Sequence, residues 1–104
     1  MIETQMSKKD LKEAFRSFLI NLDVFLDSRA ILENTRVEVL FIQEPETVFN
    51  ELYACGLVQI GQYAFPMEIS MDMDLGVVRV DSKVFHYRLK VEDMIEFVKE
   101  HGGA

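Results

Sequence analysis

The sequence predicts an α+β fold in which a long N-terminal helix and two shorter helices cover one face of a mainly antiparallel sheet of about five strands. Apolar residues recur at helical spacing in residues 11–26, and apolar and polar residues alternate strictly in residues 67–75. The length of 104 residues is close to the commonest size of one domain, so residues 1–104 are expected to form a single domain. The sequence leaves open whether residues 1–6 are ordered.

The first helix is expected to begin at Ser7, because Ser7 and Asp10 have the spacing of a capping box. Its apolar stripe occupies one wide helical face and consists of Leu11, Ala14, Phe15, Phe18, Leu19, Leu22, Phe25 and Leu26. Continuing the helix further would place Arg29 in the middle of this stripe. We therefore expect a break near residues 27–28.

Two apolar residues of the first helix, Ile20 and Val24, lie on the side opposite to this stripe. The favoured interpretation is that both pack under the chain segment that follows the break. The other interpretation is that both are exposed and contact a partner.

The middle of the chain is expected to hold a strand, a helix and a second strand. Residues 36–43 are rich in β-branched and apolar residues, which indicates a central strand covered on both faces. Pro45 suits the first turn of a helix and Gly56 suits its end, so the segment between them is predicted to be helical, with Val48, Phe49, Leu52 and Tyr53 on one face. Residues 57–60 are the next predicted strand. The sequence does not decide whether it runs parallel to the first strand, through a right-handed crossover, or returns antiparallel.

The last third of the chain is predicted to form a three-stranded antiparallel meander followed by a helix. The strands are expected at 67–74, 77–81 and 84–90, joined by two-residue turns at Leu75–Gly76 and Ser82–Lys83, and the helix at 91–101. With turns of this length, Met71 lies opposite Val80 on the buried face. On the outer face, Asp72, Arg79 and His86 then lie abreast.

The outer face of this meander has two competing interpretations. The favoured one is structural: Asp72 and Arg79 form a cross-strand charge pair that fixes the register and contributes about 0.2–1 kcal/mol. The alternative is a small-ligand, metal or acid–base site at which Asp72, Asp74 and His86 converge. Because Arg79 competes for the Asp72 carboxylate and a flat strand face offers no cavity, the structural interpretation is preferred.

The composition disfavours two classes of partner. Acidic residues outnumber basic residues 18 to 11, for a net charge of −7, and a negative field repels nucleic-acid backbones and anionic membranes. We therefore expect neither a nucleic acid nor a membrane as partner. The single cysteine, Cys55, allows no intrachain disulfide, and no apolar run is long enough to span a bilayer, which together favour a cytoplasmic protein.

No motif in the sequence specifies a reaction, a metal or a cofactor. The predicted function is therefore a small acidic protein-interaction module, such as an adaptor, regulator or inhibitor, without catalytic activity and without a cofactor. Its partner is expected to be a protein, preferably a basic one, and a homodimer through a sheet edge or the first helix is a further option. The predicted contact residues are Glu68, Asp72, Asp74, Arg79, His86 and Arg88 on the meander and Ile20 and Val24 on the first helix.

Overall fold

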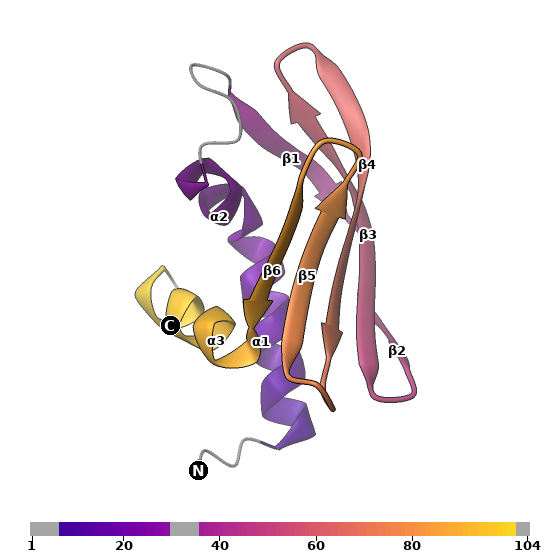
Figure 1. Ribbon diagram of the computed structural model, residues 1–104, viewed down its shortest axis with the longest axis vertical. Helices are drawn as coiled ribbons and strands as arrows, with labels where there is room; N and C mark the ends of the chain where they lie inside the picture. Colours follow the sequence, from indigo (N-terminus) through magenta and orange to yellow (C-terminus); the bar gives the residue numbers. More distant parts are fainter. Residues whose placement is uncertain (1–6, 30–35, 102–104) are drawn as a thin grey trace.

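The computed structural model describes residues 7–29 and 36–101, which form three helices and a six-stranded sheet (Figure 1). The elements are α1 (Lys8–Ile20), α2 (Leu22–Ser28), β1 (Val37–Ile42), β2 (Glu46–Val48), β3 (Glu51–Ile60), β4 (Tyr63–Asp72), β5 (Val77–Ser82), β6 (His86–Lys90) and α3 (Val91–Glu100). The strand order is β1-β3-β4-β5-β6, with β2 beside β3, and every pair is antiparallel. The helices lie on one face of the sheet, so the predicted α+β class is confirmed, with one strand more than expected. The question about residues 1–6 lies outside the described residues.

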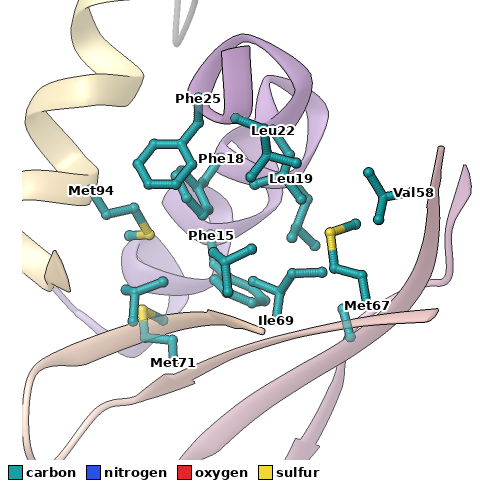
Figure 2. Packing of buried hydrophobic residues seen from close by; sticks show 14 of the residues in the cluster. Phe15, Phe18, Leu19, Leu22, Phe25, Val58, Met67, Ile69, Met71 and Met94 are labelled. Atoms are coloured by element: carbon teal, nitrogen blue, oxygen red, sulfur yellow. The ribbon is translucent and has the colours of Figure 1, made fainter. Parts of the chain in front are cut away.

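The core lies between the helices and the sheet (Figure 2). Phe15, Phe18 and Phe25 are buried on the helical side, and Met67 and Met71 are buried on the strand β4. Phe18 and Phe25 meet edge to face, with ring centroids 5.2 Å apart. The apolar stripe of the first helix and the inward direction of the β4 methionines are therefore confirmed.

The N-terminal helix begins where the sequence predicts but breaks earlier. Ser7 is the N-cap, and its Oγ accepts a hydrogen bond from the backbone amide of Asp10 at 3.1 Å. An additional break lies at Asn21, whose Nδ2 donates to the carbonyl oxygen of Ser17 at 2.9 Å. An asparagine side chain that bonds the backbone in this way competes with the next helical turn. The break expected near residues 27–28 is also present, because α2 ends at Ser28.

The prediction of a helix between Pro45 and Gly56 is wrong. This segment forms β2, a turn at Phe49–Asn50 and the start of β3. β3 is a ten-residue strand that pairs along its whole length with β4, so pairing within the sheet outweighs the local helical spacing. The two strands whose direction the sequence left undecided, β1 and β3, run antiparallel.

β1 is an edge strand and not the doubly covered central strand that the sequence predicts. Its partner in the sheet is β3, and the register shifts between Val39 and Phe41, which indicates a β-bulge at Leu40. Leu40 and Phe41 are 42% and 52% exposed, so one face of this apolar run is open to solvent. Gly56 allows the two strands to approach closely, because a Cβ there would lie 2.5 Å from the carbonyl oxygen of Phe41. Gly56 thus serves strand pairing and not, as predicted, the end of a helix.

The first hairpin of the meander has the predicted faces but a register that differs by two residues. Met71 lies opposite Val78 and not opposite Val80. The reason is the connecting loop, which holds the four residues 73–76 in place of a two-residue turn. A shift of two residues keeps each side chain on its face, so the buried face is as predicted and the outer rows are not.

The second hairpin is shifted in the same way. Val80 lies opposite Tyr87, because the two loop residues are Lys83 and Val84 and the amide of Ser82 donates to the carbonyl oxygen of Phe85. The chain then enters α3, which confirms the predicted last helix and contributes buried residues to the core.

Candidate functional site

The outer-face residues predicted to lie abreast occupy different rows of the sheet. His86 lies opposite Asp81, and its Nδ1 is 3.1 Å from the Asp81 carboxylate. Arg79 lies opposite Arg88, so two like charges face each other. Asp72 lies one row nearer the β4–β5 loop than Arg79. The prediction that Asp72, Arg79 and His86 lie abreast is therefore wrong.

Asp72 and Asp74 both take part in the β4–β5 loop. Asp72 Oδ1 accepts hydrogen bonds from the backbone amides of Asp74 and Leu75 at 2.9 and 3.0 Å. The Asp74 carboxylate accepts from Asn50 Nδ2 at 3.1 Å. These bonds give both carboxylates a structural role in shaping the loop. Within residues 7–29 and 36–101, no three His, Cys, Asp or Glu side chains gather closely enough to hold a metal ion.

The outer face around Glu68 mixes polar and apolar side chains. Glu68 lies opposite Cys55 on β3 and opposite Asp81 on β5. Cys55 is half-buried in the middle of β3, not at the helix end expected from the sequence. Hydrogen bonding with Cys55 and Glu68 raises the pKa of the Tyr53 hydroxyl above its ordinary value. This part of the face therefore brings a tyrosine, a cysteine and a glutamate together.

A groove of about 410 Å³ lies between α1 and the edge strand β1. Its apolar lining consists of Leu19 and Ile20 from α1, Val39 and Ile42 from β1, and Pro45 from the chain that follows β1. We call this hollow, with the adjoining free side of β1, the edge groove. Its volume and its apolar lining are typical of sites that receive side chains of a ligand or a peptide.

The rim of the edge groove carries an ion pair. Arg16 Nη1 lies 2.7 Å from Glu44 Oε1, and the same nitrogen donates to Glu44 Oε2 at 3.1 Å. Both side chains are more than half exposed, so the pair contributes at most about 1 kcal/mol to stability. It ties α1 to the connection between β1 and β2 and provides both a donor and an acceptor at the rim.

Ile20 is 79% exposed at this rim. The favoured interpretation, in which it packs under the following segment, is therefore wrong for Ile20. Val24 is also exposed but belongs to α2 and does not line the edge groove. An isoleucine side chain that remains largely in water adds little to the core of this chain.

The free side of β1 extends this surface. β1 pairs with β3 along one side, and no other strand of the described sheet pairs with it. Its outward backbone amides and carbonyls are thus open to a further strand, which is the usual vulnerability of a sheet edge. Leu40 and Phe41 add exposed apolar area beside these backbone groups.

Sequence reasoning identified Ile20 but missed the rest of the edge groove. The missing signal was Pro45, because a proline so close to an apolar strand is typical of a sheet edge. Reading Pro45 as the start of a helix placed residues 36–43 in the centre of the sheet. The predicted contact residues on the meander are exposed or half-buried, but none of them lines the groove at which Ile20 lies.

None of the helices in the described part of the chain is long and apolar enough to cross a membrane. Comparisons with protein-family models, with curated proteins and with solved structures gave no match for this chain.

Proposed function

We propose that this protein is a non-catalytic interaction module that binds an extended segment of a partner protein at the edge groove. The observation that carries the proposal is the coincidence of an unpaired strand edge, β1, with an apolar hollow of about 410 Å³ directly beside it. Either feature alone is common on protein surfaces, but together they offer both backbone pairing and a place for side chains.

The binding mode is addition of a partner strand to β1. Backbone hydrogen bonds to β1 provide affinity, and alternate side chains of the added strand point to opposite faces of the sheet. On the helical face they enter the hollow lined by Ile20, Val39 and Ile42. On the outer face they cover the exposed Leu40 and Phe41.

The chemistry of the surface favours a basic and apolar segment. Glu38 and Glu46 are exposed along β1 and the chain that follows it, and Glu44 is paired with Arg16. Arg36, just before β1, is also exposed. With a net charge of −7, the protein attracts a cationic segment over a distance, which raises the association rate at low salt. We place this interaction in the cytoplasm, in keeping with the single cysteine.

The test compares the wild type with Ile20→Asp and Phe41→Lys, which alter the hollow and the outer side of β1. Val84→Asp, which also places a charge at an exposed apolar position but lies outside the groove, serves as the control. Immobilised wild-type protein is used to capture partners from lysate, and each captured protein is then purified and titrated against the wild type and the three variants. We expect a loss of affinity of tenfold or more for Ile20→Asp and Phe41→Lys and none for Val84→Asp.

Hydrogen exchange provides the structural readout. Addition of a strand slows exchange of the outward amides of β1, while the amides of β6 at the other edge are unaffected. Equal binding by all four proteins, or protection confined to β6, would contradict the proposal. If the captured species is a second copy of this chain, the occupant is a homodimer partner and the basic-segment assignment is wrong.

A further inference from the structure

The turn between β2 and β3 exposes a phenylalanine in an unfavourable backbone conformation. Phe49 has a φ of 56° and is 96% exposed. Glycine, asparagine or aspartate is the usual residue at a positive φ in a two-residue hairpin turn, because a bulky side chain there clashes with its own backbone. In the described residues, no other residue except glycine has a positive φ.

Neither stability nor solubility explains this residue. The side chain is almost wholly in water, so it contributes no burial to the core, and its backbone is strained. The neighbouring Asn50 would accept a positive φ more easily, yet the strain falls on Phe49. A strained and exposed aromatic residue points to a role outside the fold of the chain itself.

The turn is held in place by bonds from two other elements. The backbone carbonyl oxygen of Asn50 accepts a hydrogen bond from the amide of Met73 at 2.9 Å. The side-chain Nδ2 of Asn50 donates to the Asp74 carboxylate at 3.1 Å. Lys8 Nζ, at the start of α1, donates to Asn50 Oδ1 at 2.7 Å. The β2–β3 turn, the β4–β5 loop and α1 therefore meet at one end of the sheet, at the bottom of Figure 1. Because these hydrogen bonds already order the turn, Phe49 loses less conformational entropy when a partner binds it.

The surroundings of Phe49 are apolar next to the turn and acidic around it. Val48 precedes it on β2, and Leu75, 68% exposed, lies on the loop that Asn50 contacts. Glu46, Glu51 and Asp74 are exposed in β2, β3 and the loop. Lys8 beside the turn donates to the neutral Asn50 side chain and keeps its positive charge, so the three acidic residues outnumber this one basic residue. An apolar centre with an acidic border is complementary to an apolar pocket with a basic border.

We infer that Phe49 is the anchor of a second protein contact, inserting into an apolar pocket that is bordered by lysine or arginine side chains on a partner protein. Large aromatic side chains held in a fixed orientation are the commonest anchors of protein interfaces. This contact is separate from the hollow of the edge groove, because none of its residues lines that hollow, although Glu46 lies between the two surfaces. The acidic border makes an anionic membrane the wrong occupant.

The first experiment uses the protein alone. Phe49→Asn retains a residue that tolerates a positive φ and removes the exposed ring. We expect its melting temperature to rise by about 4 °C or more, because the strain is relieved and no buried contact is lost. Phe49→Leu, which keeps both the apolar character and the strain, is the matched control and is expected to melt close to the wild type. A fall in the melting temperature of Phe49→Asn would mean that the ring stabilises the fold, and the inference would be overturned.

The second experiment identifies the occupant. Phe49→p-benzoylphenylalanine is irradiated in cells, with the same photoreactive residue at the exposed Glu92 of α3 as control. We expect a protein adduct specific to position 49. The purified partner is expected to bind Phe49→Asn at least tenfold more weakly than it binds the wild type. Its affinity for the wild type is expected to fall as the salt concentration increases. The inference fails if adducts match those of position 92, if the adduct is a second copy of this chain, or if the wild type binds phosphatidylcholine or phosphatidylserine vesicles through Phe49.

The two proposed contacts are separable by their variants. Ile20→Asp, which alters the edge groove, is expected to leave the position-49 adduct unchanged. Loss of that adduct in Ile20→Asp would show one shared site and would contradict an independent contact at Phe49.

Discussion

Replacing Gly56 by alanine is the most direct test of how β1 is held at the edge of the sheet. An added Cβ would lie 2.5 Å from the carbonyl oxygen of Phe41 and 3.1 Å from Cγ1 of Ile42. The closer atom belongs to the backbone, so β1 itself must move. Overpacking of this kind costs about 1–3 kcal/mol, and for a domain of about 100 residues that corresponds to a fall in melting temperature of roughly 5–20 °C.

The displacement should also be local. Because β1 pairs with β3 opposite Gly56, we expect Gly56→Ala to accelerate hydrogen exchange in β1 before it affects β4 or β5. Gly76→Asn is the matched control: Gly76 has a φ of 69° with nothing within 4 Å of an added Cβ, and asparagine tolerates that conformation. A Gly56→Ala protein that melts like the wild type, with β1 exchange unchanged, would refute the close approach of β1 and β3.

Two further predictions concern the outer face of the sheet. The pKa of the Tyr53 hydroxyl is raised in the folded state, so the stability that this group contributes is complete below the ordinary pKa of 10.0 and declines as the pH rises above it. Tyr53→Phe is therefore expected to lose less stability than the wild type between pH 9 and 11, and Tyr63→Phe is the control. Equal losses in Tyr53→Phe and the wild type would contradict the assignment. Zinc, manganese and calcium ions are expected to leave the melting temperature unchanged, because Asp72 and Asp74 bond within the β4–β5 loop and its surroundings and His86 pairs with Asp81. A rise in melting temperature that both Asp72→Ala and His86→Ala abolish would instead support a metal site.

The parts of the fold that could be predicted from the sequence are those with long periodic patterns. The apolar stripe from Phe15 to Leu26 and the alternation along β4 each repeat over many residues, and both faces agree with the structure. The α3 stripe behaves in the same way, with Met94 and Val98 buried. Patterns of this length specify a face even where the exact loop length is unknown.

Loop length and short ambiguous segments could not be predicted. The Asp72 side chain caps a four-residue loop, which moves every β4–β5 pair by two residues without changing any face. Residues 46–53 have a helical spacing of apolar side chains, but pairing of β3 with β4 along ten residues decides their conformation. Such pairing joins residues far apart in the sequence, so no local pattern reports it.

The two candidate contacts both lie where the local rules of the sequence fail. The apolar run of β1 suits a doubly covered strand, yet β1 is at the edge with Leu40 and Phe41 in water. A turn at positive φ suits asparagine or glycine, yet Phe49 occupies it. When most of a chain follows the rules of propensity and burial, its exceptions concentrate at functional sites. Substituting a residue that suits the local structure at each of these two positions is therefore expected to remove binding but not stability. Phe41→Lys and Phe49→Asn are expected to lose their partners and keep the fold. Phe18→Ala, in contrast, is expected to lose about 3–5 kcal/mol of stability because Phe18 is buried in the core.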